Sequence, residues 1–450
     1  MKLVKSLLLG SAAGIAAVAG AQAADLPSRK AAPVEYVRVC SAFGASFFYI
    51  PGTDTCLRIG GRVRGEYTFG ERWNAGQDSY GTRVQGRIFV DARNQTAYGT
   101  LRTFVRFDGN TRTGSYRYGG LNAGANMFNA VPGTADPTPF LLETAIVQFG
   151  PLTAGKMQSF YSFYANDIGF SSLRTSDRNT NLLAYTATFG SGFSATISLE
   201  DPSTTARRGG RFVNGAVVAN PAFRGMTYPD VVASLRVDQG WGSAQLSAAI
   251  GDRGLYVSPW GPAVAGLAAG SKKDEMGWAI QAGVKLNLPM IAAGDTLWLQ
   301  AGYADGAIEY LGAAGGTAVG FGRLPAYVPV NFGWNAFGNF KATTGFNLVA
   351  AFRHFWTPQI RSDFIGSYAA LKTNDGVGVL KSIDPKELIL GASLVWMPVA
   401  GLDIGVEVLY SRMEYGARVI DAKSAILGVN ARTIKSDDAW AGRLRIQRDF

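Results

Sequence analysis

The sequence predicts an all-β fold: a transmembrane antiparallel β-barrel of about sixteen strands, with short turns at one end and long loops at the other. Three observations lead to this fold class. Segments of roughly 9 to 14 residues alternate between apolar and polar side chains along nearly the whole chain. The connections between them are short and long in turn. The mean hydropathy, +0.06, is too low for a bundle of membrane-spanning helices.

The N-terminal residues 1–23 have the form of a secretory signal peptide. Lys2 and Lys5 precede an apolar run over residues 7–19, and Ala-Gln-Ala at 21–23 is a small-residue cleavage site. The run is shorter than the ~20 residues that a spanning helix needs, which favours a cleaved signal over a membrane anchor. Its removal would lower the formal net charge from +10 by the two lysines, to +8.

Residues 24–56 are interpreted as a periplasmic lead-in followed by a disulfide loop. The lead-in, residues 25–35, is polar and contains proline. Cys40 and Cys56 are the only two cysteines of the chain, and export places them in an oxidising compartment, so we expect them to pair. A bridge that closes so few residues contributes on the order of 3 kcal/mol. It would therefore stabilise one local loop and not the whole fold.

The barrel is assigned to residues 57–450, and residues 82–93 show its alternating pattern most plainly. Arginine, glutamine and aspartate occupy one face of this segment, and valine, isoleucine and alanine occupy the other. The alternation resumes at residue 101 after a short connection around Tyr98 and Gly99, which indicates a hairpin. The expected strands begin near residues 58, 82, 99, 140, 152, 182, 192, 229, 241, 275, 295, 344, 360, 387, 402 and 438.

Two architectures produce such alternation: a soluble sandwich or propeller, and a barrel in a membrane. In a soluble fold the apolar faces meet each other, and the lengths of the connections need not alternate. In a membrane barrel the apolar faces contact lipid and the polar faces line a lumen. The barrel alone explains the polar strand faces, the turn and loop alternation and the even strand number. It also closes on the last strand, because an open sheet edge is not tolerated in a bilayer.

Aromatic residues near the strand ends are expected to form girdles at the two membrane interfaces. Ordinary strand propensity also favours aromatic residues, so this observation is weak by itself. The expected girdle residues are Tyr67, Phe69, Tyr185, Phe189, Tyr303, Phe355, Trp356, Trp396, Tyr410, Tyr415 and Trp440.

Several stretches of the chain resemble the alphaproteobacterial outer-membrane porins. They are YVRVCSAFGASFFYIPGTDTCLRIGGRVRGEY (36–67), RHFWTPQIRS (353–362), LDIGVEVLYSR (402–412) and RLRIQRDF (443–450). The resemblance implies a sixteen-stranded, usually trimeric barrel whose third external loop folds into the lumen. It also implies that Phe450 is a recognition signal for the barrel-assembly machinery. Arg448 departs from the pattern, because another apolar residue is more usual at that position.

Arginines on the inward faces of the strands are expected to form a basic wall. A barrel of about sixteen strands is wide enough for an aqueous channel, so selectivity depends on its lining. Closure brings the last strand beside the first ones, which makes these cations contiguous. Alternatively, some of them point outward and bind lipopolysaccharide phosphates. The wall is assigned to Arg62, Arg64, Arg83, Arg87, Arg93, Arg102, Arg106, Lys156, Arg443 and Arg445.

By the same resemblance, residues 161–181 are the constriction loop. Two of its carboxylates, facing the arginine wall, would create a transverse field across the pore. Alternatively, these carboxylates pair with Arg174 and Arg178 inside the loop, which would be a weak surface interaction. The candidate residues of the loop are Tyr161, Phe163, Tyr164, Asp167 and Asp177.

The expected function is passive diffusion of small hydrophilic solutes through a homotrimeric outer-membrane channel with a slight anion preference. A substrate-specific channel for sugars or anions stays open as an alternative. So does a surface adhesin or phage receptor, which would use the long loops at residues 111–139, 201–229 and 306–343. Besides a second copy of the chain and solutes, the expected partners are outer-membrane lipid, lipopolysaccharide and the barrel-assembly machinery.

The sequence favours no enzyme, cofactor, metal site or nucleic-acid partner. His354 is the single histidine, so the chain has no histidine cluster for a metal or a conventional catalytic triad. Residues 150–157, GPLTAGKM, approach a phosphate-binding loop but lack its final serine or threonine and lead into a strand. Basic residues scattered over alternate strand positions do not form a nucleic-acid surface.

Overall fold

The computed structural model divides the chain into two compact units, Met1–Leu57 and Arg58–Phe450. The predicted signal peptide and the whole lead-in, residues 25–35, lie outside the residues that the structure describes. Those residues are 38–70, 79–114, 140–202, 211–213, 216–218, 226–256, 272–313, 331–334, 340–373, 382–420 and 433–450.

The described part of the first unit is a small segment stabilised by one disulfide. Cys40 and Cys56 form this bridge, which confirms the predicted pairing. Both cysteines are buried together with Phe47. A two-residue strand pairs with residues 56 and 57 and brings the ends of the segment together. The short elements of this unit are η2 (Ser41–Phe43) and β1 (Phe48–Tyr49).

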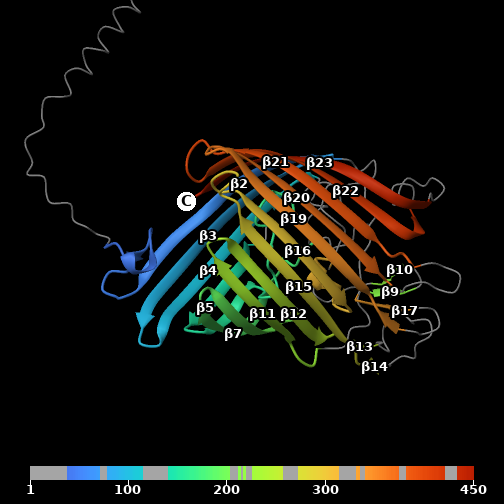
Figure 1. Ribbon diagram of the computed structural model, residues 1–450, viewed down its shortest axis with the longest axis horizontal. Coiled ribbons are helices and arrows are strands. Elements are labelled where there is room, and N and C mark those ends of the chain that lie inside the picture. Colours follow the sequence, from blue (N-terminus) through green and yellow to red (C-terminus); the bar gives the residue numbers. More distant parts are fainter. Residues whose placement is uncertain are drawn as a thin grey trace, which may run out of the picture. The chain divides into compact units, whose positions relative to one another are not determined.

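The second unit is a closed antiparallel barrel (Figure 1). Its main sheet has seventeen described strands, of which sixteen form the barrel and the other is β1. Pairing of β2 with β23 closes the ring. Each barrel strand begins within five residues of its expected start. The strands are β2 (Cys56–Gly70), β3 (Tyr80–Thr96), β4 (Gly99–Arg112), β5 (Phe140–Phe149), β6 (Leu152–Gln158), β7 (Asn179–Gly190), β8 (Phe193–Glu200), β11 (Asp230–Gln239), β12 (Gly242–Asp252), β15 (Met276–Asn287), β16 (Thr296–Asp305), β19 (Thr344–Thr357), β20 (Ile360–Lys372), β21 (Lys386–Trp396), β22 (Leu402–Ile420) and β23 (Thr433–Asp449).

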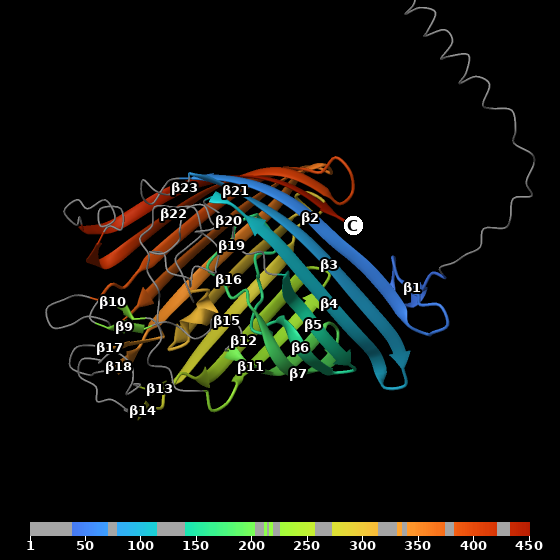
Figure 2. The ribbon, with the colours of Figure 1, turned by 180° about the vertical axis from the view of Figure 1, so that it is seen from behind.

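Short elements occupy parts of the longer connections between barrel strands. Tight turns join the strands at one end, and Figure 2 shows the barrel from behind, with β2 to β7 in view. Within the described residues, no helix has the length and hydropathy of a membrane span. The short elements are the hairpins β9 (Arg211–Val213) with β10 (Ala216–Val218), β13 (Leu255–Tyr256) with β14 (Lys272–Lys273) and β17 (Phe332–Trp334) with β18 (Phe340–Ala342), and the turn of helix η5 (Ile308–Leu311).

The barrel is polar on its inner face and apolar on its outer face. On β12, Gln245 is 7% exposed and the adjacent Leu246 is 47% exposed. On β22, Glu407 is 2% exposed, between Val406 and Val408 at 50% and 51%. A soluble sandwich buries its apolar face, so this arrangement is the reverse of that fold. The exposed apolar band requires a lipid environment.

Most of the expected girdle aromatics lie on the outer face, but two do not. Tyr410 and Trp440 pack together there, with ring centroids 4.9 Å apart. Tyr415 is wrong as a girdle residue, because it is 6% exposed and belongs to an inner apolar cluster. Phe355 is also wrong, because its register partner is Arg361, which is 8% exposed on the inner face. Near a strand end, the alternation pattern and the neighbouring charges thus predict the inner or outer position of a side chain better than its aromatic character does.

The barrel seam ends in a close contact between Gly61 and Phe450. Gly61 N donates to Phe450 O at 2.9 Å, and Phe450 N donates to Gly61 O at 3.0 Å. A Cβ atom at Gly61 would lie 2.6 Å from the Phe450 ring, so a larger residue does not fit.

We expect Gly61→Leu to lower the free energy of unfolding by about 1–3 kcal/mol, the usual cost of overpacking. Urea titration of the refolded protein in detergent measures this change. Gly65→Leu is the matched control on the same strand, because a Cβ atom at Gly65 meets nothing within 4 Å. Equal losses in the two variants would show that the contact with Phe450 does not matter.

Candidate functional site

The predicted constriction loop is the segment between β6 and β7, residues 159–178, and it contacts the inner faces of the barrel strands. The expected range ended at residue 181, but β7 already begins at Asn179. Amide side chains on the inner faces of β12, β15 and β16 bind its first half. Gln245 and Gln281 each donate to a main-chain carbonyl of the loop at 3.1 Å. Gln300 accepts from Tyr164 N at 2.9 Å.

Charged side chains of β22 and β23 hold the tip of the loop, Phe170 and Ser171. Glu407 accepts from Phe170 N at 2.8 Å and from the Ser171 hydroxyl at 2.6 Å. Arg443 and Arg445 both donate to Phe170 O, and the Arg445 guanidinium lies 4.1 Å from the centre of the Phe170 ring. Hydrogen bonds to charged groups are stronger than neutral ones, so these contacts fix the tip against the wall.

The aromatic residues of the loop anchor it and do not line the pore. Tyr161 and Tyr164 are fully buried, and Phe163 is 6% exposed. Phe163 and Tyr164 pack on Trp298 of β16, with ring centroids 5.2 and 5.5 Å apart. Burial raises the pKa of Tyr164, so its hydroxyl stays neutral and donates to a carbonyl of the same loop at 3.0 Å.

The acidic residues of the loop behave differently from its arginine. Arg174 pairs with Glu387 of β21, which the sequence pattern did not single out. Asp167 and Asp177 are exposed, and neither forms an ion pair with a described lysine or arginine. Asn166 donates to Asp177 at 2.9 Å. The alternative pairing of these carboxylates with Arg174 and Arg178 is therefore not present as ion pairs, and both carboxylates are accessible to solvent.

A second inward segment, residues 306–313, packs on the constriction loop. Its helical turn η5 is buried throughout. Tyr310 contacts Tyr161 edge to face, with ring centroids 4.6 Å apart. Asn347 of β19 donates to Arg174 O at 2.9 Å and to Leu311 O at 3.3 Å, so one side chain binds both segments. The constriction loop is thus held from two sides.

A buried ionic cluster fixes this second segment. Arg253 donates to Asp230 at 2.8 Å and to Glu309 at 2.9 Å, and its side chain is 3% exposed. The hydroxyl of Tyr310 donates to Asp230 at 2.8 Å. Against the effect of burial, the Glu309 and Asp230 carboxylates raise the pKa of Arg253, so the guanidinium stays charged.

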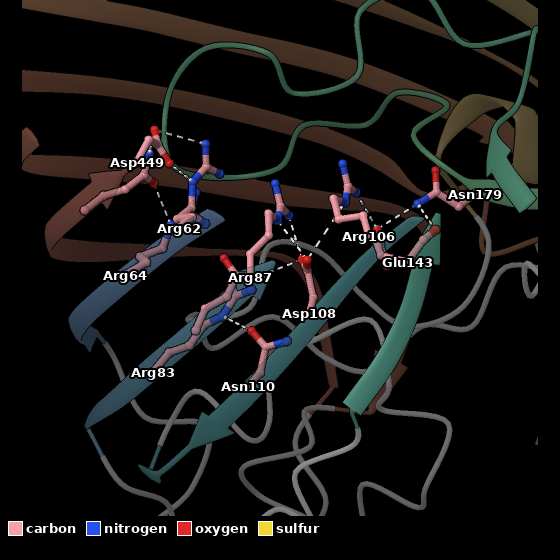
Figure 3. A network of polar contacts seen from close by, with 12 residues as sticks. Arg62, Arg64, Arg83, Arg87, Arg106, Asp108, Asn110, Glu143, Asn179 and Asp449 are labelled. Carbon is pink, nitrogen blue, oxygen red and sulfur yellow. Dashed lines mark hydrogen bonds and ion pairs between the residues drawn. The ribbon is translucent and has the colours of Figure 1, made fainter. Parts of the chain in front are cut away.

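Nine of the ten predicted wall residues are arginines on the inner faces of β2, β3, β4 and β23. Figure 3 shows the side chains of several of them on the same side of the sheet. Five carboxylates pair with them, so nine positive charges exceed these five negative charges by four; Arg112 at the end of β4 and Asp437 near the start of β23 add one charge of each sign. The ion pairs are Arg62–Asp449 (2.5 Å), Arg83–Glu66 (3.5 Å), Arg87–Asp108 (2.6 Å), Arg93–Asp91 (2.7 Å), Arg102–Asp91 (2.9 Å), Arg106–Glu143 (3.3 Å), Arg443–Glu66 (3.6 Å) and Arg445–Glu66 (2.5 Å).

Lys156 is wrong as a member of the basic wall. The register pairs it with Ala145 and Asn181, on the outer face that it shares with Leu152. Its Nζ donates to Leu142 O at 2.9 Å. Alternation along the short strand β6 places Lys156 outside, although its charge suggested the lumen. The wall therefore consists of arginines.

His354 is bound to a single carboxylate. Its Nδ1 lies 2.7 Å from an oxygen of Asp295, which also accepts from Phe355 N at 2.8 Å. Among the residues described by the structure, no group of three or more His, Cys, Asp or Glu side chains is placed to hold a metal ion. The three long loops of the adhesin hypothesis lie largely outside the described residues.

Comparison with protein families and with curated proteins gives one consistent result. A family profile described as "Porin subfamily" matches residues 25–443. Porin Omp2b of Brucella suis biovar 1 (strain 1330) is 35% identical over 248 residues, 53% of this chain and 64% of the relative. Porin Omp2b of Brucella abortus (strain 2308) is 35% identical over 247 residues. The matched part is thus less than two thirds of the length of these relatives.

Solved structures share the fold at low sequence identity. The outer membrane channel DcaP of Acinetobacter baumannii has a TM-score of 0.57 and 11% identity, and the match covers 89% of this chain and 99% of that one. OmpT of Vibrio cholerae has a TM-score of 0.50 and 11% identity over the same shares. At such identities the likeness establishes the barrel architecture alone.

Proposed function

Because this chain belongs to the alphaproteobacterial porin family and is thus an integral outer-membrane protein, we propose that it forms a water-filled channel for passive diffusion of small hydrophilic solutes. The accessibility of the inner face carries the proposal. The side chains of Arg87 and Arg106 face inward yet are 20% and 26% exposed. Water therefore reaches the arginines of β3 and β4, while the tip of the constriction loop contacts Arg443 and Arg445 of β23.

The proposed channel has a weak preference for anions. The surplus of arginines over carboxylates on β2, β3, β4 and β23 gives that part of the lumen a positive potential, and guanidinium groups stay charged at any working pH. The exposed carboxylates of Asp167 and Asp177 on the loop lower this positive potential. Together with the arginines they would create a transverse field across the lumen. A small net selectivity results from these opposing charges.

We expect Arg106→Glu to shift the channel toward cations, with the chloride-to-potassium permeability ratio falling about twofold. The new carboxylate would stand beside Asp108 and Glu143, which now share Arg106. Reversal potentials in a potassium chloride gradient measure the ratio. Lys156→Glu makes the same change of charge on the outer face and should leave the ratio unaltered. A ratio that responds equally to both changes argues against a lumenal arginine wall.

A general diffusion channel is favoured over a sugar-specific one by the position of the loop aromatics. A sugar channel needs aromatic faces that are free to stack on the solute. Tyr161 packs on Tyr310, and Phe163 and Tyr164 pack on Trp298 of β16. These buried rings are not available for stacking on a solute. Solute competition in liposome swelling would test this choice: rates that fall smoothly with solute size support general diffusion.

We further propose that three copies of the chain associate through the outer face around β6. This strand has only seven residues, which at about 3.3 Å per residue and a tilt of about 45° span about 16 Å. The apolar band of such barrels is about 25 Å tall, so β6 is too short to span the lipid hydrocarbon layer. A neighbouring copy of the chain would cover this part of the outer face. Leu152 and Leu183 are exposed there at 46% and 52%. Chemical cross-linking in membranes should give dimers and trimers but no larger species.

The remaining assignments concern export and assembly. We propose that residues 1–23 are removed on export, that residues 24–56 lie in the periplasm, and that the assembly machinery recognises Phe450. We also propose that membrane lipid, including lipopolysaccharide, covers the outer face. N-terminal sequencing of the purified protein tests the first assignment: a start at Ala24 or Asp25 supports it, and a start at Met1 refutes it.

A further inference from the structure

Within the described residues, Arg64 differs from the other arginines of the wall because it forms no ion pair with a carboxylate. Each of the other eight lies within ion-pair distance of an aspartate or a glutamate. Among the described residues, Arg64 has none. Its Nε donates to Gln447 Oε1 at 2.8 Å, which fixes the orientation of the guanidinium. The two terminal nitrogens remain available on a partly exposed side chain.

The register of the strands explains why Arg64 lacks a counter-charge. Glu66 approaches Arg83 at 3.5 Å and the Thr68 hydroxyl donates to Gly81 O, which sets β2 against β3. In an antiparallel pair, moving two residues toward the N-terminus on one strand corresponds to moving two residues toward the C-terminus on the other. Because Glu66 lies beside Arg83, Arg64 lies beside Gln85. Arg64 therefore stands in a row of amides, Gln447, Gln85 and Asn110.

The neighbouring rows differ in their charge balance. On one side, the row contains two carboxylates and two guanidinium groups, whose charges cancel: Asp449, Arg62, Arg87 and Asp108 (Figure 3). On the other side, Arg445 and Arg83 share the single carboxylate of Glu66, which Arg443 also approaches. Most of the positive surplus of the wall therefore gathers around Arg64. A guanidinium with free nitrogens at such a place binds an oxyanion well, because its planar fork can donate two parallel hydrogen bonds.

We propose that Arg64 anchors an oxyanion-binding subsite in the channel, which takes the phosphate or carboxylate group of a permeating solute. The subsite rests on the proposed channel function and adds a preferred solute class to it. Arg83, whose Nε is held by Asn110 at 2.9 Å, supplies the adjacent charge. Gln447 of β23 fixes the orientation of the Arg64 guanidinium through the hydrogen bond to its Nε.

The test is a single-channel recording in potassium chloride with added potassium phosphate at pH 7 and constant ionic strength. We expect phosphate to lower the current through the wild-type protein, and this decrease to reach a plateau as the phosphate concentration rises. Arg64→Gln should raise the half-blocking concentration about tenfold, as the loss of one charge-assisted interaction predicts. Arg64→Lys should restore the charge but only part of the block, because an ammonium cannot donate the parallel pair of bonds.

Arg93→Gln is the matched control, because it removes the same charge from the same wall at a residue that pairs with Asp91. Its half-blocking concentration should stay within about twofold of the wild type. A parallel recording uses potassium acetate in place of potassium phosphate. Block by phosphate alone, or by phosphate and acetate alike, supports the subsite and identifies which group it accepts. Equal weakening in Arg93→Gln and Arg64→Gln, or normal conductance without block, overturns the subsite. Absence of conductance in the wild-type protein overturns the channel function itself.

Discussion

Replacing Arg253 by methionine is expected to lower the free energy of unfolding by about 3–5 kcal/mol, the usual cost of breaking a buried ion pair. Methionine fills a similar volume but leaves the carboxylates of Asp230 and Glu309, at 1% and 0% side-chain exposure, without their cation. The cost arises from these two uncompensated charges. Urea unfolding in detergent micelles, followed by tryptophan fluorescence, gives the change in free energy.

The matched control for this change is Arg236→Met. Arg236 also forms an ion pair, with Asp238 at 2.7 Å, but the two side chains are 39% and 54% exposed. Exposed pairs contribute about 1 kcal/mol or less, so this variant should unfold almost as the wild type does. If both variants lose the same stability, the cluster around Arg253 does not hold the second inward segment in place.

Replacing Glu407 by glutamine is expected to turn a steady open-channel current into a fluctuating one. Glu407 accepts hydrogen bonds from Phe170 N, Ser171 N and the Ser171 hydroxyl. Glutamine keeps the size of the side chain but loses its charge and one acceptor oxygen. Hydrogen bonds to a charged group contribute about 1.5–3 kcal/mol, so the population of the detached tip should rise about tenfold or more. Current noise in single-channel recordings measures this population.

Asp403→Asn provides the control for the tip of the loop. Asp403 is an inward carboxylate of the same strand, β22, and it pairs with Arg361 at 2.8 Å. In the described part of the chain it forms no hydrogen bond or ion pair with the constriction loop. The noise of this variant should match that of the wild type. A quiet Glu407→Gln channel would mean that the other contacts suffice to hold Phe170.

The barrel is readable from the sequence because its strands obey a purely local rule. Alternation assigns each side chain to lipid or lumen, and tight turns mark where a strand ends. Arg443 and Leu444 show the result: neighbours in sequence, they are 8% and 41% exposed. Lys156 was misplaced because its charge was given more weight than its place in the alternation. Near the ends of short strands, alternation is the better guide.

The attachment of the constriction loop is not readable from the sequence, because it depends on pairs far apart in the chain. Alternation places Glu407 on the inner face, but its partners Phe170 and Ser171 are more than 230 residues away. The same holds for Glu387 with Arg174. The sequence pattern also does not indicate that the loop aromatics pack on Trp298 and Tyr310 and do not line the lumen. Only the closed barrel brings these groups together.

Single-channel conductance and reversal potential of the purified protein in a planar bilayer most directly test whether this porin forms an open channel with an arginine wall. We expect stepwise conductance, with steps in threes if the protein is a trimer, and a reversal potential of weak anion selectivity in a potassium chloride gradient. Absence of conductance would contradict the channel, and clear cation selectivity would contradict the dominance of the arginines in its lumen.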